Sequence, residues 1–69
     1  MSISENFSIE NQEVILRALR KYNRPLRLLE LKKESALANL YFFEGLKNLE
    51  HKDLIKKTKI EGKTWISLH

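Results

Sequence analysis

Residues 49–68 read LEHKDLIKKTKIEGKTWISL, and the spacing of the apolar residues changes in the middle of this stretch. Upstream of it, Phe42, Leu46 and Leu49 are four and three residues apart, which is the spacing of one face of an α-helix. Downstream, apolar and polar residues alternate on both sides of Glu61-Gly62, as in two strands joined by a turn. The sequence therefore predicts a helix over about 39–52 and a β-hairpin over about 55–68.

Two more helices are predicted nearer the N-terminus. Ile15, Leu19 and Tyr22 recur at helical spacing, and Ser8 is a suitable N-cap, so the first helix is expected at about 9–22. Pro25 stops it, because the residue before a proline is pushed out of the helical region. Leucines on one face predict a second, short helix over about 27–34.

The connections and the single tryptophan also carry expectations. Residues 35–38 are expected to form a tight connection, and Asn39 to cap the third helix. Asp53 is expected to end that helix, since aspartate tolerates the left-handed conformation found at helix ends. Trp65 is expected to pack the hairpin against the third helix, and the alternative is that it stacks or wedges.

The charged residues fall in blocks along the chain, whose net charge is +4. Residues 17–33 carry a net charge of +6 and residues 51–69 of +3, whereas residues 1–16 carry −3 and residues 34–50 carry −2. The two basic blocks favour a polyanionic partner such as nucleic acid. The alternative is that these charges are ordinary solvated surface.

The order of these elements resembles the winged helix-turn-helix superfamily. The resemblance is carried by the segments Pro25–Leu31, Ala36–Ala38 and Leu49–Ile55 and by Gly62 at the tip of the wing. Small prokaryotic, archaeal or viral regulators of the MarR and ArsR kind are nearest in pattern. The resemblance implies an α+β fold, a three-helix winged helix-turn-helix with a C-terminal β-hairpin wing. It also implies a short strand just before the second helix. The winged-helix domain is expected over residues 8–69, behind a flexible tail of residues 1–7.

In that superfamily the third helix enters the major groove of DNA while the wing reaches the neighbouring backbone. Carried over to this chain, the resemblance implies double-stranded DNA as partner. Lys47 and Asn48 are the conventional candidates for reading bases. Glu44 would repel phosphates, although a carboxylate can accept from a cytosine amino group. The implied DNA-binding residues are Arg24, Arg27, Lys32, Lys33, Tyr41, Glu44, Lys47, Asn48, Lys57, Lys59 and Lys63.

The third helix also suggests a protein partner. Phe42 is assigned to the core, and consecutive helical positions point about 100° apart, so Tyr41 and Phe43 cannot both join it. Exposed aromatic residues are enriched at protein interfaces. Gly45 suggests a close backbone approach by DNA or protein. Two functions therefore stay open: a DNA-binding transcription regulator acting as a homodimer, or a winged-helix protein-protein interaction module that docks a partner through its acidic, aromatic third helix.

Catalytic chemistry has little support in the sequence. There is no cysteine, and the two histidines, His51 and His69, have no metal-ligand spacing. No glycine-rich phosphate loop or oriented nucleophile is present. We therefore expect no enzyme activity, no metal and no cofactor. No apolar run approaches the length of a membrane span and no signal peptide is recognisable, so a cytoplasmic location is expected.

Overall fold

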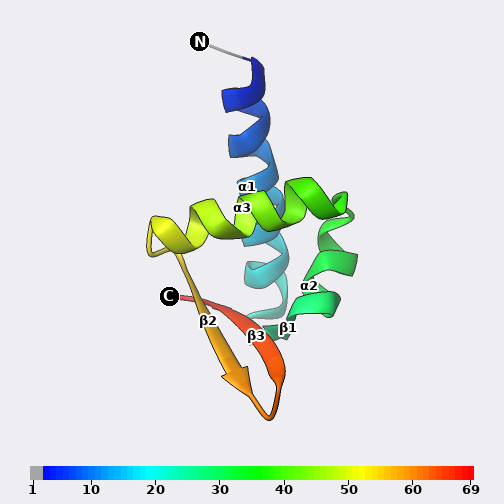
Figure 1. The fold of residues 1–69 in the computed structure, drawn as a ribbon, viewed down its shortest axis with the longest axis vertical. Helices are drawn as coiled ribbons and strands as arrows, with labels where there is room; N and C mark the ends of the chain where they lie inside the picture. Colours follow the sequence, from blue (N-terminus) through cyan, green and yellow to red (C-terminus); the bar gives the residue numbers. More distant parts are fainter. Residues whose placement is uncertain (1–2) are drawn as a thin grey trace.

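The computed structural model describes the backbone of residues 3–69 and the side chains from residue 9 onward. Figure 1 shows α3 crossing in front of α1, with α2 beside them and the hairpin projecting away from the helices. The elements in chain order are α1 (Ile3–Tyr22), β1 (Leu26–Arg27), α2 (Leu28–Ser35), α3 (Asn39–His51), β2 (Ile55–Ile60) and β3 (Lys63–Leu68).

The three strands form one antiparallel sheet in the order β1-β3-β2. β1 pairs with β3 through Leu26 opposite Ile66, and β2 pairs with β3 along its whole length from Ile55 opposite Leu68. β1 is the short strand that the resemblance places before the second helix. The predicted α+β architecture, three helices and a C-terminal hairpin, is confirmed.

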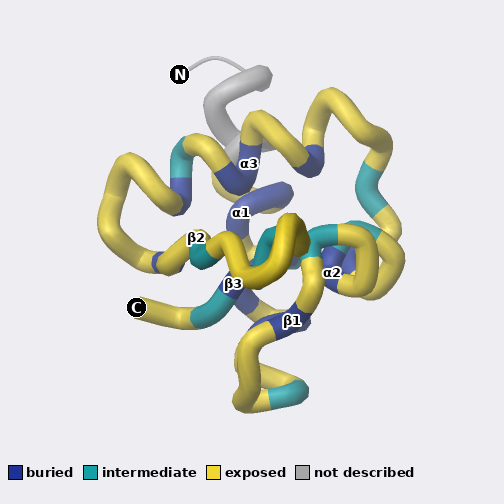
Figure 2. Tube along the Cα trace, turned by 60° about the horizontal axis from the view of Figure 1, so that its bottom comes forward, coloured by how far each residue is buried: buried dark blue, intermediate teal, exposed yellow. Residues whose placement is uncertain are grey.

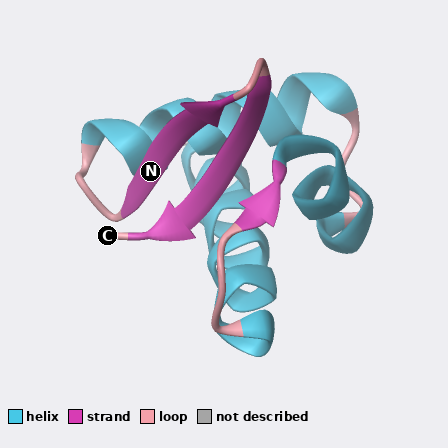
Figure 3. Cartoon of the chain, turned by 90° about the horizontal axis from the view of Figure 1, so that it is seen from below, coloured by secondary structure: helices cyan, strands magenta, loops and turns pink. Residues whose placement is uncertain are grey.

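The helices cover one face of the sheet and leave the other uncovered. Figure 3, seen from below, shows the strands in front of the helices. Successive residues of a strand point to opposite faces, and the buried Leu26 and Ile66 share the face that meets the helices. Figure 2 shows that the buried segments gather where α1, α3 and the sheet meet.

The core is built from every element of the fold. Leu26 of β1, Leu31 of α2 and Ile66 of β3 are fully buried. Burying a side chain of this size contributes about 1.5–3 kcal/mol, so a core of this kind supports a small domain without disulfides. The remaining fully buried large side chains are Ile15 and Leu19 of α1 and Phe42 and Leu49 of α3.

Residues with positive φ end the helices and turn the hairpin. Asp53 has φ 60° and follows α3, as expected from the sequence. Its N–H donates to Glu50 O and the Leu54 N–H donates to Leu49 O, both at 3.0 Å, which is the Schellman arrangement. Glu61 (φ 51°) and Gly62 (φ 78°) both have positive φ, as a two-residue type I′ turn requires. The hairpin register follows from this turn.

Three local predictions are wrong. α1 begins at Ile3 rather than after Ser8, because no glycine or proline interrupts residues 3–8. Residues 3–7, which the sequence predicts as part of the tail, therefore lie in α1. The first two residues of the predicted tail lie outside the described residues. Asn39 is the first residue of α3, and the N-cap is Ala38, which makes no side-chain capping bond. Trp65 pairs with Arg27 and Thr58 on the uncovered face of the sheet, so it does not pack against α3.

Candidate nucleic-acid interface

α3 presents an exposed outer face opposite its buried one. Residues three or four apart in a helix share a face, which places Leu40, Phe43, Glu44 and Lys47 together. The same four residues and Asn39 line a shallow surface depression of about 460 Å³. Leu40 is 70% exposed and Phe43 48% exposed. We refer to Leu40, Phe43, Glu44 and Lys47 as the outer face of α3.

The buried face of α3 meets α1 at Gly45. A Cβ placed on Gly45 would lie 2.9 Å from Cδ1 of Ile15, so the two helices touch at this glycine. Farther along, Lys52 Nζ donates to Gln12 Oε1 at 2.8 Å. The close approach that Gly45 suggested in the sequence is therefore made by a helix of the same chain.

The predicted reading residues lie on the outer face of α3 and along its border. Lys47 and Glu44 lie on the outer face of α3, as a groove-reading role requires. Tyr41 and Asn48 lie three residues before and four after Glu44, and four before and three after Gly45, which places both at the border between the outer face and the side that meets α1. Both already make interactions within the chain. The helix brings Lys47 and Glu44 together with Leu40 and Phe43, and places Asn48 beside Glu44 at the border of this face.

The predicted wing lysines are also divided. Lys57 lies opposite Ile66 and Lys59 opposite Thr64, so both are on the helix-covered face of the hairpin. Lys57 forms an ion pair of 3.6 Å with Glu50 at the end of α3. Lys63 lies opposite Ile60, on the uncovered face and next to the turn. Only Lys57 and Lys59 therefore lie on the side of the wing that adjoins α3.

The four basic residues predicted around α2 occupy different environments. The Arg24 guanidinium pairs with Glu30 at 3.4 Å and lies 5.4 Å from the centre of the Tyr22 ring. Arg27 is exposed on β1, at the N-cap of α2. Lys32 is half-buried and Lys33 exposed, both in the last turn of α2, where positive charge suits the helix dipole. These residues are not gathered into one cluster with α3.

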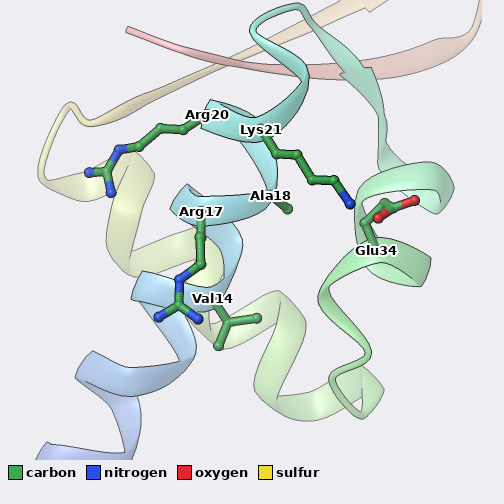
Figure 4. Close-up of a pocket in the computed structure, with 6 residues that line it drawn as sticks. All are labelled: Val14, Arg17, Ala18, Arg20, Lys21 and Glu34. Carbon is green, nitrogen blue, oxygen red and sulfur yellow. The ribbon is translucent and has the colours of Figure 1, made fainter.

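A larger concavity of about 540 Å³ lies between α1 and α2. Figure 4 shows Lys21 extending toward Glu34 while Arg20 points to the other side of α1. Arg20 Nη1 lies 3.8 Å from Glu13 Oε2, so the carboxylate partly compensates the charge of the guanidinium. The other lining residues are Val14, Arg17 and Ala18. This concavity is separate from the outer face of α3.

Tyr22 connects the end of α1 to α2 beside this concavity. Its hydroxyl donates a hydrogen bond of 2.7 Å to Glu34 Oε1. The bond to the Glu34 carboxylate raises the pKa of Tyr22, because the phenol must give up this acceptor to ionise.

Two features of the site were missed in the sequence. Leu40 completes the outer face of α3. It lies three, four and seven residues before Phe43, Glu44 and Lys47, and this helical spacing could have predicted that it shares their face. Lys56 lies opposite Ser67 on the uncovered face of the hairpin, and alternation with Ile55 would have placed it there.

Within the described chain, no cluster of His, Cys, Asp or Glu is placed to hold a metal ion. No helix in residues 3–69 has both the length and the apolar character needed to cross a membrane.

Comparison with known proteins gives structural relatives only. No protein family and no curated protein sequence matches the chain. A structure concerned with the regulation of DNA binding of Bordetella bronchiseptica BpsR by 6-hydroxynicotinic acid is similar at a TM-score of 0.75 and 22% identity. The likeness covers 86% of this chain and 42% of the BpsR chain, so this chain matches less than half of that protein.

A second similar structure concerns the DNA recognition and protein interaction domains of HOP2 and their homologous DNA pairing properties. Its TM-score is 0.71 and its identity 22%, over 86% of this chain and 98% of that one. At such identities the likeness concerns the fold. The chain has a winged-helix fold.

Proposed function

We propose that this chain is a cytoplasmic DNA-binding transcription regulator of the MarR and ArsR kind. In this proposal the outer face of α3 enters the major groove and the wing follows the adjacent backbone. The observation that carries it is the uncovered outer face of α3, with Lys47 at its centre and Lys57 and Lys59 on the side of the wing that adjoins it. The DNA binding of the structural neighbour BpsR supports the same assignment.

Within this interface the charges have different tasks. Lys47 is the one base of the outer face of α3 and is assigned to a base edge or a phosphate. Lys59 and Lys57 are assigned to phosphates, and Lys57 must leave Glu50 to make its contact. Asn48 and Tyr41, at the border of the outer face beside Glu44, are proposed to contact DNA at the margin of the groove. Arg24, Arg27, Lys32 and Lys33 are proposed to contact phosphates beyond it.

The test is duplex binding measured by fluorescence anisotropy across a salt series, first with a random-sequence duplex. We expect wild-type affinity to fall steeply with salt, by a slope of about 0.9 for each phosphate neutralised. Lys47→Ala is expected to weaken binding about 5- to 10-fold, as the loss of one direct contact does. Lys21→Ala on α1 removes the same charge away from the interface and serves as the matched control. If wild type does not bind duplex DNA even at low salt, the proposal is wrong.

A second candidate function rests on the apolar part of the same face. Leu40 and Phe43 are large, exposed and adjacent, and such residues are typical of protein contacts rather than of phosphate contacts. In this alternative the chain is a protein-protein interaction module. Leu40→Ser with Phe43→Ser discriminates the two functions, because it removes a protein contact but leaves every cation of the duplex interface in place.

We further propose that the regulator acts as a homodimer, because one domain of this size spans few base pairs. The exposed side of α1, with Ile9 at its N-terminal end, is assigned to the dimer contact. Sedimentation equilibrium at micromolar concentration tests this part separately from DNA binding.

A further inference from the structure

The uncovered face of the sheet carries a groove on the side of the hairpin away from Lys57 and Lys59. Its volume is about 400 Å³, within the roughly 300–1,000 Å³ typical of small-ligand sites. Trp65 of β3 lies at the centre of this face, between Arg27 of β1 and Thr58 of β2. The groove is lined by Arg24, Pro25, Thr58, Ile60, Trp65 and Ser67.

Positive charge surrounds this groove. Arg27, Lys56 and Lys63 are exposed and share the uncovered face with Trp65. Within residues 9–69 none of the three forms an ion pair, whereas Lys57 on the opposite face is paired with Glu50. Arg24 at the rim is held by Glu30 and by the carbonyl oxygen of Pro25. The strands contribute no carboxylate to this face.

An aromatic ring in an apolar groove surrounded by cations matches the chemistry of an unpaired nucleic-acid strand. A base stacks on an aromatic side chain through its flat face, while the backbone phosphates meet lysine and arginine. In a duplex the flat faces are covered by neighbouring bases, so only an unpaired base can lie on Trp65. The hydroxyls of Thr58 and Ser67 add neutral hydrogen-bonding groups beside the ring.

We propose that the uncovered face of the sheet binds single-stranded DNA, with one base stacked on Trp65 and its phosphates on Arg27, Lys56 and Lys63. The strand would occupy the side of the hairpin opposite Lys57 and Lys59. The choice of DNA rather than RNA rests on the proposed function, because the same hairpin then contacts duplex and unpaired DNA on its two faces. The site itself depends on the residues of the sheet and on Arg24 and Pro25 just before it.

The experiment uses a twelve-nucleotide oligothymidine, which has little structure of its own. Trp65 is the only tryptophan, so its fluorescence reports the stacking directly. We expect saturable quenching of wild type, and binding by labelled-oligonucleotide anisotropy that weakens about 5- to 100-fold in Trp65→Leu. Trp65→Phe keeps an aromatic ring and should retain most of the affinity. Thermal melting by circular dichroism verifies that both variants are folded.

Lys56 and Lys59 provide a matched pair on opposite faces of one strand. Lys56→Gln is expected to weaken oligothymidine binding several-fold, and Lys59→Gln to leave it nearly unchanged. Equal effects of the two, or unchanged binding by a folded Trp65→Leu, would overturn the inference. So would preferential binding of an oligouridine of the same length, or no binding of either strand, as expected if a protein segment occupies the groove.

The two proposals fail in different ways. If wild type binds duplex DNA but not oligothymidine, this inference is wrong and the proposed function stands. If oligothymidine quenches the Trp65 fluorescence of wild type but no duplex binds, the proposed function is wrong and the site on the sheet stands. Because each variant is measured on both ligands, the two results are obtained from the same proteins.

Discussion

At the scale of single residues, Gly45 decides how closely α3 approaches α1. Glycine within a helix costs about 1 kcal/mol relative to alanine, so a helix former would be preferred if only α3 mattered. The structure supplies the reason for glycine, since a Cβ here would lie 2.9 Å from Cδ1 of Ile15, which is itself fully buried. The contact between the helices outweighs the local preference.

Gly45→Ala is therefore expected to destabilise the domain by about 1 kcal/mol, because overpacking of about 1–3 kcal/mol exceeds the gain in helix propensity. Ile15→Val removes the colliding Cδ1 atom. We expect the double variant to be more stable than the sum of the single effects, with a coupling of about 1 kcal/mol. Urea unfolding of the four proteins measures this. An alanine that stabilises the wild-type background would show that Ile15 moves aside freely.

Tyr22 gives a prediction in pH. Its pKa is raised by the hydrogen bond to Glu34, so the bond's contribution to stability is fully present below the ordinary tyrosine pKa of about 10 and is lost as pH rises through the higher folded value. Tyr22→Phe should be less stable than wild type near pH 7, with the difference disappearing in strong alkali. A difference that persists unchanged at high pH would mean that the hydrogen bond does not stabilise the fold.

At the scale of elements, α3 and the hairpin are the parts that the sequence predicts well. Phe42, Leu46 and Leu49 repeat at helical spacing, and Glu61-Gly62 supplies the two positive φ values of the turn. Both patterns depend only on residues close together in the sequence, so the bounds of these elements are predicted to within a residue or two. The start of α1 is missed because Ser8 can cap a helix but nothing in residues 3–8 prevents a helix from continuing through them.

The parts of the site that depend on tertiary register could not be predicted in the same way. Lys57, Lys59 and Lys63 look alike in the sequence, and only the pairing of β2 with β3 assigns Lys63 to the other face. Packing of Trp65 against α3 is predicted, yet strand pairing places Trp65 opposite Arg27 and Thr58, and Ile66 takes the buried position next to it. Lys47 and Asn48 are consecutive and point about 100° apart, so Lys47 lies on the outer face of α3 and Asn48 at its border.

Leu46→Ala and Leu49→Ala test the buried face of α3. Each should cost about 2–5 kcal/mol, against a total stability of about 3–5 kcal/mol for a core of this size. We therefore expect both variants to be largely unfolded at room temperature. Leu40→Ala makes the same truncation at a position that is 70% exposed and should stay within about 0.5 kcal/mol of wild type. Cooperative melting of Leu49→Ala near the wild-type temperature would contradict the assigned core.

At the scale of the whole molecule, the positive charges are spread over three surfaces. The wing and the sheet carry lysines on two faces, and α1 carries Arg17, Arg20 and Lys21 beside the concavity with Glu34. A net charge of +4 draws any polyanion toward the protein, so weak binding alone does not identify the surface in contact. The dependence of affinity on salt does, because it counts the phosphates that are actually neutralised.

The triple variant Lys57→Ala, Lys59→Ala and Lys63→Ala is expected to weaken binding to all duplexes alike and to flatten the slope of log affinity against log salt by about 2 to 3 units. The lower value is favoured because Lys57 begins paired with Glu50 and Lys63 lies on the other face of the hairpin. Arg17→Ala, Arg20→Ala and Lys21→Ala together remove the same charge from α1 and should leave the slope almost unchanged. If the α1 variant flattens the slope and the wing variant does not, the duplex lies along α1, and the assignment of the wing to the DNA backbone is wrong.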